Sequence, residues 1–422
     1  MAPELLDTAG GGPFGPAPAG RVRTPSGRTI SADTARRIWR SVPGNTRRAR
    51  DSRVDLYARW CNEHGRIATD PGTVPDYAAH LAALHHPAET IAAYTATIAA
   101  QLAMSGHPLD DEDRSYVRAV INDRSAEEAG DDDGQGDALQ ATECTREDLA
   151  KMLATRNGET VAGKRDVFAL TLDWYMAGRA SEPASLNLRD VRETVAEVLD
   201  TDSGELVALP ALVVTLRRSK TNPHGRLRDV VRIVAQGDET CPVAAYRAWR
   251  EVLDAEGVTS GPLLRRVKDN KLTTAGRPPA DPRRAGGIGD RTIRNLIRDC
   301  AQAAGLTAEL TDEQKQLLST TAERATLADV ADETERARIR TELRQRRRAL
   351  RRTLPRFSGH SFRRGPVRHL QRLKVPRHLI EQQFRYVAGS QALARYLDDM
   401  VPWDDNPTVT IRTAAARATP SP

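Results

Sequence analysis

A histidine and an arginine three residues apart, His360 and Arg363, lie in the segment SGHSFRRG (358–365). Both side chains can act on a phosphate, because an imidazole exchanges protons near neutral pH and a guanidinium presents several donors to two oxygens. The spacing alone decides little, since a chain with nine histidines and many arginines contains such a pair by chance. His369 and Arg372 repeat it nearby. The meaning of the first pair therefore depends on what other reactive groups the chain supplies.

The arginine content of the chain favours a nucleic-acid partner. The 422 residues carry a formal net charge of +6, and only seven of the 63 basic residues are lysines. A guanidinium matches the geometry of phosphate oxygens, so this bias favours nucleic acid over a generic basic surface. A high-GC coding sequence would enrich arginine and alanine in the same way. Composition leaves both interpretations open.

Cysteine spacing and hydropathy restrict the class of protein. The four cysteines lack the C-x-x-C spacing of a zinc ribbon and indicate no disulfide framework, which fits a reducing compartment. No apolar run approaches the length of a membrane span, and the first twenty residues lack the apolar core of a signal peptide. We therefore expect a cytoplasmic protein with no membrane partner, and no metal site built from cysteines.

Composition divides the chain into five stretches. A chain of this length exceeds what one core usually organises, which predicts two domains and additional segments. The stretches are a Gly/Pro-rich tail expected to be disordered (1–30), a small helical domain with a basic N-terminal helix (31–125), an acidic linker (126–142), a second domain (143–406) and a C-terminal tail (407–422).

The second domain contains the clearest strand signals of the chain. The segments ELVALPALVVTLRRSK (205–220) and RLRDVVRIV (226–234) are rich in Val, Leu and Ile and are joined by the turn sequence KTNPHG. Helical patterns precede and follow them, and Thr145 with Asp148 predicts a capping box at the first helix. We expect a mainly α protein with a small antiparallel β-sheet, of the α+β class.

A charged segment at 306–355 interrupts the second domain. Acidic residues concentrate in its first half and arginines in its second, an order that suits the helix dipole and i,i+4 pairing. The pattern predicts a solvated helical hairpin with many salt bridges. The alternative is that the arginine-rich end contacts DNA phosphates.

Several motifs in the second domain occur in an order that resembles a known family. GRASEPASLNLRDV (178–191), the lysine of RRSKTNPHG, SGHSFRRG and AGSQALARYLDD together resemble the catalytic domain of the tyrosine recombinase (phage integrase) family. The helical segments before the linker are similar to the core-binding (SAM-like) DNA-binding domain of that family. The resemblance covers about 40–125 and 143–405, leaves 306–355 as an insertion, and is closest to an actinobacterial integrase-like group.

The resemblance implies a reaction class and a set of roles. A recombinase of this kind attacks the scissile phosphate of DNA with a tyrosine hydroxyl and forms a 3′-phosphotyrosyl intermediate, so it needs neither ATP nor a metal or other cofactor. Tyr396 matches the nucleophile, and Arg179 and Arg363 match the two arginines that hold the phosphate. His360 resembles the histidine that bonds the phosphate and exchanges a proton with the tyrosine.

Two further roles are implied, and one position is ambiguous. Lys220, at the end of a predicted strand, matches the lysine that protonates the leaving 5′-oxygen, and Glu182 would orient Arg179. The family has a His or Trp about ten residues before the nucleophile, where this chain has Tyr386 or, with a one-residue shift, Val387. The sequence FRYV stands where the group tends to read GGW.

The implied partner is double-stranded DNA with specific recombination sites, bound by a homotetramer in the nucleoid. Accessory DNA-bending or directionality factors can accompany such enzymes, and the tail 407–422 would pack on a neighbouring subunit. Two alternatives remain at this point: a type IB topoisomerase-like nicking–closing enzyme, and a recombinase-derived DNA-binding protein whose site is weakened at 384–387.

Overall fold

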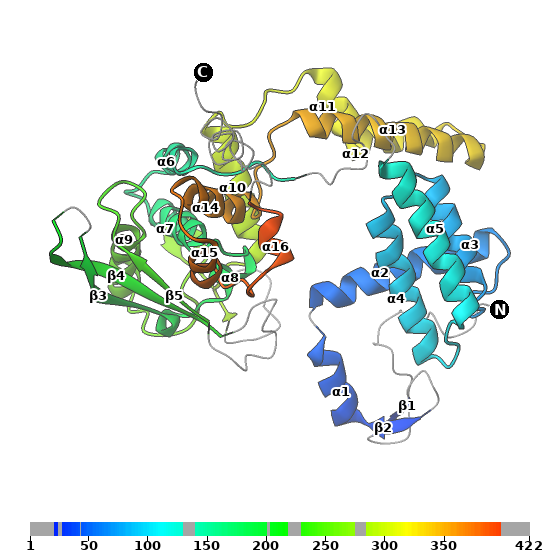
Figure 1. Ribbon diagram of the computed structural model, residues 1–422, viewed down its shortest axis with the longest axis horizontal. Coiled ribbons are helices and arrows are strands. Elements are labelled where there is room, and N and C mark those ends of the chain that lie inside the picture. The colour runs from blue at the N-terminus through cyan, green and yellow to red at the C-terminus, as the bar shows by residue number, and fades with distance from the viewer. Residues whose placement is uncertain are drawn as a thin grey trace, which may run out of the picture. The chain divides into compact units, whose positions relative to one another are not determined.

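The computed structural model describes residues 21–23, 28–42, 44–129, 140–200, 203–217, 229–274 and 284–397 (Figure 1). The protein is mainly helical with a small antiparallel sheet, which confirms the predicted α+β class at this level. The chain forms two units, one from Met1–Ala138 with Thr311–Leu350 and the other from Leu139–Leu310 with Arg351–Pro422. Within the described ranges, no helix combines the length and apolar character that a membrane crossing requires.

The first unit is built on a helical bundle around aromatic side chains. Tyr57, Trp60 and Tyr77 pack with ring centroids 5.0–6.4 Å apart. Val54, Tyr57, Trp60 and Cys61 are also buried in this unit, whereas Leu56 is 37% exposed. The helices are α1 (Ala32–Ser41), α2 (Gly44–Glu63), α3 (Thr73–Ala83), α4 (Ala88–Met104) and α5 (Asp111–Ala129).

The N-terminal segment contains a short β pairing within the range predicted to be a disordered tail. β1 (Arg21–Arg23) pairs antiparallel with β2 (Thr29–Ser31), and the latter leads directly into α1, where the Ser31 hydroxyl accepts a hydrogen bond from the Thr34 amide at 3.1 Å. The β-branched residues Val22, Thr29 and Ile30 favour this pairing. Residues 1–20, most of the predicted linker and the C-terminal tail lie outside the described part of the chain.

The charged segment folds as two short helices and a long one, where the sequence predicts a two-helix hairpin. These are α11 (Asp312–Leu318), α12 (Thr320–Ala328) and α13 (Glu333–Thr353). Ser319 separates the first two, because its hydroxyl caps α12. Arg347 on α13 holds the short helices through the Ser319 carbonyl at 2.8 Å and the Glu323 carboxylate, and Arg344 donates to the Leu84 carbonyl. These contacts attach the segment to the first unit, although in sequence it interrupts the second.

The second unit surrounds a three-stranded antiparallel sheet in the order β3-β4-β5. β4 (Leu206–Leu216) and β5 (Asp229–Val234) confirm the two predicted strands, and Val214 of β4 lies opposite Val191 and Val231. β3 (Val191–Leu199) was missed by the sequence analysis. Its sequence, VRETVAEVL, places charged residues and alanine on a largely solvated strand, which weakens the sequence signal.

Helices cover this sheet and carry most of the site. The predicted capping box is confirmed at α6, where Thr145 and Asp148 bond each other's backbone amides. The elements are α6 (Arg146–Ala154), α7 (Val161–Tyr175), α8 (Ser181–Ser185), a 3₁₀ turn η2 (Leu188–Asp190), α9 (Pro242–Ala255), the short pair β6 (Val267–Lys268) and β7 (Lys271–Leu272), α10 (Asp290–Ala303), α14 (Ser361–Arg372), α15 (Arg377–Gln383) and α16 (Gln391–Ala394).

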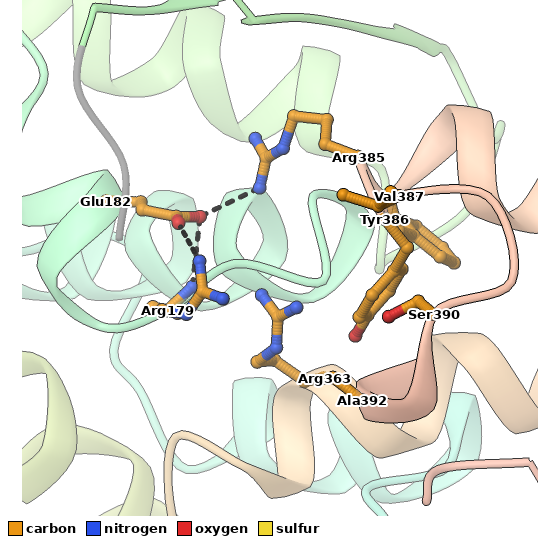
Figure 2. Close-up of a pocket in the computed structure, with 9 residues that line it drawn as sticks. Arg179, Glu182, Arg363, Arg385, Tyr386, Val387, Ser390 and Ala392 are labelled. Atoms are coloured by element: carbon orange, nitrogen blue, oxygen red, sulfur yellow. Dashed lines mark hydrogen bonds and ion pairs between the residues drawn. The ribbon is translucent and has the colours of Figure 1, made fainter. Parts of the chain in front are cut away.

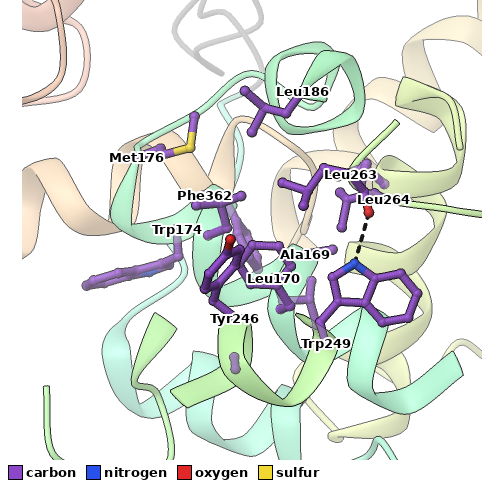
Figure 3. Packing of buried hydrophobic residues seen from close by; sticks show 14 of the residues in the cluster. Ala169, Leu170, Trp174, Met176, Leu186, Tyr246, Trp249, Leu263, Leu264 and Phe362 are labelled. Atoms are coloured by element: carbon purple, nitrogen blue, oxygen red, sulfur yellow. Dashed lines mark hydrogen bonds between the residues drawn. The ribbon is translucent and has the colours of Figure 1, made fainter. Parts of the chain in front are cut away.

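The core of the second unit fixes α7, which is buried on nearly all sides, against α14. Phe168 of α7 and Phe362 of α14 are fully buried in one apolar cluster. Figure 3 shows Phe362 among its neighbours in this cluster. Two buried indole nitrogens of this core have partners: Trp249 donates to the Leu263 carbonyl and Trp174 to the Cys144 carbonyl, both at 2.9 Å. This packing holds the two helices from which the candidate site is built.

Another segment of the backbone packs closely against α14 at Gly365. A Cβ atom on Gly365 would lie 1.8 Å from the carbonyl oxygen of Cys144, a backbone atom of the segment that leads into α6. Glycine is therefore required here by space, although alanine is the better helix former by about 1 kcal/mol.

We predict that Gly365→Ala destabilises the protein by about 1–3 kcal/mol, because the clash with backbone outweighs the gain in helix propensity. Urea unfolding followed by circular dichroism measures the change. Gly158→Ala is the matched control, since a Cβ there meets no atom within 4 Å. An increase in stability for Gly365→Ala would show that the two segments are less closely packed than described.

Candidate active site

The first element of the candidate site is Arg363, on the first turn of α14. The residue is 4% exposed, and its Nη1 atom donates to the Ala177 carbonyl at 2.7 Å. Ala177 follows α7 and has φ +42°, a left-handed conformation that is strained for a residue with a Cβ. The strained turn thus presents a carbonyl that fixes the orientation of the Arg363 guanidinium.

The same turn leads to Arg179 and the buried carboxylate of Glu182. Glu182 Oε1 accepts from Arg179 Nη1 at 3.0 Å, and Oε2 accepts from the Arg179 backbone amide at 3.2 Å. Glu182 is 2% exposed, whereas the Arg179 side chain is 30% exposed. The carboxylate therefore holds Arg179 from behind while part of the guanidinium faces the opening, as Figure 2 shows.

His360 and Tyr396 meet directly. His360 Nδ1 lies 2.9 Å from the Tyr396 hydroxyl, a hydrogen bond whose donor depends on the tautomer of the ring. Tyr396 follows α16, whose Leu393 is buried in a small cluster with Val367 and Phe384. Thirty-five residues therefore separate the two groups in sequence, and the packing of α16 on α14 brings them together.

Tyr386, rather than Val387, turns toward this group. The Arg363 guanidinium lies 5.1 Å from the centroid of the Tyr386 ring and 5.9 Å from that of Tyr396. Val387 is 72% exposed. The Tyr386 hydroxyl is buried, and no hydrogen bond of normal geometry reaches it from the described residues. Burial raises the pKa of Tyr386, and the nearby Arg363 guanidinium opposes that increase.

These side chains border one pocket of the second unit. Four of the predicted site residues line this pocket: Arg179, Glu182, Arg363 and Tyr386. His360 and Tyr396 adjoin it through the contacts above, and Lys220 lies outside the described residues. The full lining is Arg179, Glu182, Arg363, Phe384, Arg385, Tyr386, Val387, Ser390 and Ala392 (Figure 2).

Arg385, which lines this pocket, was not predicted from the sequence. Its Nη2 atom donates to Glu182 Oε2 at 2.8 Å, and its side chain is 10% exposed. Its backbone has φ +60°, again the left-handed region. The only signal in the sequence was its place in FRYV, where the resembling group tends to read GGW.

The sequence analysis also missed Asp173, a fully buried carboxyl on α7. Neither carboxylate oxygen has a hydrogen-bond partner within the described ranges. Burial, followed by the negative charge of Glu182, raises its pKa to about 8, although Arg363 and Arg385 act in the opposite direction. An aspartate within the apolar run FALTLDWYM was a signal that could have identified it.

The second His-x-x-Arg pair has a structural role. Arg372 forms an ion pair with Glu143, and the His369 ring packs edge-on against Trp174 with centroids 5.9 Å apart. Neither residue lines the pocket. His369 and Arg372 thus have different surroundings from His360 and Arg363. They can serve as matched controls for substitutions of that first pair.

The chemistry available in the pocket is that of an anion site. Three guanidinium groups, those of Arg179, Arg363 and Arg385, share the carboxylate of Glu182, and the raised pKa of Asp173 limits the negative charge that this second acid adds. Such groups suit an oxyanion with forked donors. In the described part of the chain, no group of three His, Cys, Asp or Glu side chains is arranged to hold a metal ion.

Comparison with known proteins adds no family assignment. No protein-family model matches the sequence, and a search of curated proteins finds no significant match.

We predict that Asp173 makes stability depend on pH. Its folded-state pKa of about 8 exceeds the unfolded value of 3.8, so the folded state keeps a proton that the unfolded state loses. Stability should therefore fall as pH rises from about 4 to about 8, by more than about 1 kcal/mol relative to Asp173→Asn. Chemical unfolding of both proteins across this range isolates the contribution, because other groups cancel. A pH-independent difference would contradict the raised pKa.

Proposed function

We propose that this protein is a site-specific DNA recombinase that cuts and rejoins DNA through a 3′-phosphotyrosyl intermediate, with Tyr396 as nucleophile. The observation that carries the proposal is the hydrogen bond between His360 Nδ1 and the Tyr396 hydroxyl at 2.9 Å, beside the buried Arg363. An acceptor at the phenol oxygen, next to a fixed cation, is the arrangement that attack on a phosphodiester requires.

The proposed reaction begins with attack by the Tyr396 oxygen on the scissile phosphorus. Its proton passes to the His360 ring nitrogen, provided that the tautomer leaves Nδ1 unprotonated. A bond forms between the phenol oxygen and phosphorus, and the bond to the 5′-oxygen breaks. The leaving oxygen takes a proton, the role proposed for Lys220. The phosphotyrosyl bond conserves the energy of the phosphodiester, so a 5′-hydroxyl can reverse the reaction without ATP.

The arginines would stabilise charge on the phosphate as it becomes pentavalent. Arg363 is fixed by the Ala177 carbonyl, and Arg179 is fixed by Glu182, so both are oriented before substrate binds. Prearranged donors in a partly buried pocket stabilise a developing charge more than mobile ones do. The Tyr386 hydroxyl has a spare donor that would reach a phosphate oxygen in the position where the family has His or Trp.

The proposed partner is double-stranded DNA, bound at two specific sites by a homotetramer in the nucleoid. The surface of α2 in the first unit supports this proposal, because Arg48 and Arg50 are exposed on it. Arginines on a helix surface supply the sequence-independent part of such binding through phosphate contacts. Whether the reaction is integration or excision, and which accessory factors take part, depends on the target site. That site would be found in the DNA that flanks the gene.

We predict that the wild-type protein forms a covalent complex with DNA and that Tyr396→Phe forms none. Nicked duplexes from the flanking DNA, or a randomised pool, trap the phosphotyrosyl intermediate because the cleaved end diffuses away. The complexes are detected after denaturation. An adduct with Tyr396→Phe would exclude Tyr396 as nucleophile. If wild type forms no adduct with any duplex, the alternative of a DNA-binding protein without catalytic activity is favoured. Relaxation of plasmids that lack a target site would indicate a topoisomerase.

His360→Gln should slow formation of this complex by about 10²-fold or more, because the proton acceptor is lost. His369→Gln is the matched control, since it changes the same residue type nine positions away on α14, outside the pocket. Thermal unfolding of both variants shows whether the fold is intact. Equal slowing by the two variants would contradict a specific role of His360.

Tyr386→Phe should slow the same step by about tenfold, because it removes a donor to a charged oxygen but keeps the ring. Its stability should not fall, since the hydroxyl has no hydrogen bond of normal geometry from the described residues. Val387→Ala is the control, because Val387 is exposed. A larger effect of Val387→Ala would show that the register is shifted by one residue.

A further inference from the structure

We propose that Arg385 is a third arginine of the anion pocket and that its guanidinium binds an oxygen of the same phosphate as Arg179 and Arg363. The identification of that phosphate as a DNA phosphodiester rests on the proposed function. The binding of an oxyanion by the three guanidinium groups is independent of that function, because it follows from the pocket itself.

The first observation is an unfilled donor. Arg385 Nη2 is bonded to Glu182, but Nη1 is buried and has no hydrogen-bond partner among the residues the structure describes. The side chain is nine-tenths buried and lines the pocket together with Arg179 and Arg363 (Figure 2). A buried cationic donor without an acceptor is unfavourable, and an anionic oxygen in the pocket would supply that acceptor.

The second observation is the backbone of Arg385. The residue follows the end of α15, at a position with φ +60°. Glycine adopts this conformation without strain, whereas a residue with a Cβ atom is strained there. Arginine at this position is thus unfavourable for the fold of the turn. Its side chain does not lie in solvent but enters the pocket, where it lies with the guanidinium groups of Arg179 and Arg363.

The third observation is the distribution of charge. Glu182 is shared between Arg179 Nη1, at 3.0 Å, and Arg385 Nη2, at 2.8 Å, so one carboxylate orients two guanidinium groups. Glu182 cannot neutralise both. Asp229 on β5 and Asp173 on α7 are the other acidic groups that act on this cluster, and Asp173 has a raised pKa. With Asp173 protonated, positive charge remains for a phosphate.

Binding of inorganic phosphate, at constant ionic strength and below about pH 7, tests the pocket without DNA. The protein is titrated with inorganic phosphate and binding is followed by chemical shifts. The apparent Kd for phosphate should rise about tenfold in Arg385→Gln. It should rise by less in Arg385→Lys, because lysine keeps the charge. Arg372→Gln is the control, because Arg372 pairs with Glu143 outside the pocket. Unchanged or tighter phosphate binding by Arg385→Gln would overturn the proposal.

Arg385→Gly separates loss of the guanidinium from loss of the fold. Glycine relieves the left-handed backbone, so this variant should unfold at the same temperature as wild type or higher, yet bind phosphate as weakly as Arg385→Gln. If it binds phosphate as well as wild type does, the arginine contributes nothing to the pocket and the inference is wrong.

The covalent-capture assay distinguishes this inference from the proposed function. If wild type binds phosphate through Arg385 but never forms an adduct with DNA, the anion pocket stands and the recombinase proposal fails. If wild type forms the adduct and Arg385→Gly forms it at the same rate or faster, the recombinase proposal stands and Arg385 is not a phosphate-binding residue.

Discussion

The pocket depends on one buried carboxylate. Glu182 is 2% exposed and binds the backbone and guanidinium of Arg179 as well as the guanidinium of Arg385. A buried charge is tolerated only when it is paired and hydrogen-bonded. Arg179, Arg385 and Glu182 therefore form one unit, in which Glu182 keeps two hydrogen bonds to Arg179 when Arg385 is replaced. This unit joins α8 to the segment after α15.

A second constraint joins that unit to α14. The Ala177 carbonyl, presented by a left-handed turn at the end of α7, fixes Arg363, and the contact of Gly365 with the Cys144 backbone fixes the helix that carries it. Both contacts involve backbone atoms of segments distant in sequence. Ala177 and Arg385, two of the non-glycine residues with a positive φ, both contact the side chains of this pocket, at some expense of local stability.

The sequence predicted features that are set locally. The capping box at Thr145, the two Val-rich strands and the α+β class were all readable from composition and short-range pattern. β3 was not, because its stability comes from pairing with β4 rather than from its own residues. Likewise the charged segment was predicted as an isolated hairpin, whereas Arg344 and Arg347 anchor it through backbone carbonyls and Glu323, which no local pattern reveals.

The candidate site shows the same division. The order of motifs indicated Arg179, Glu182, His360, Arg363, Tyr386 and Tyr396, and the fold gathers these around one pocket. Asp173 and Arg385 have no motif, and their importance appears only when burial and partners are known. The choice between Tyr386 and Val387 also needed the fold, because a left-handed residue just before Tyr386 changes the direction in which each side chain points.

Asp173 and an anion in the pocket must influence each other. Arg363 and Arg385 act on the Asp173 carboxyl, and the same two guanidinium groups face the pocket. An anion bound there would add negative charge near Asp173 and raise its pKa further, so the proton would be held more tightly. By thermodynamic linkage, the loss of that proton weakens anion binding by the same free energy. A neutral Asp173 therefore allows a fully buried acid to lie near Arg363 and Arg385 without cancelling their charge.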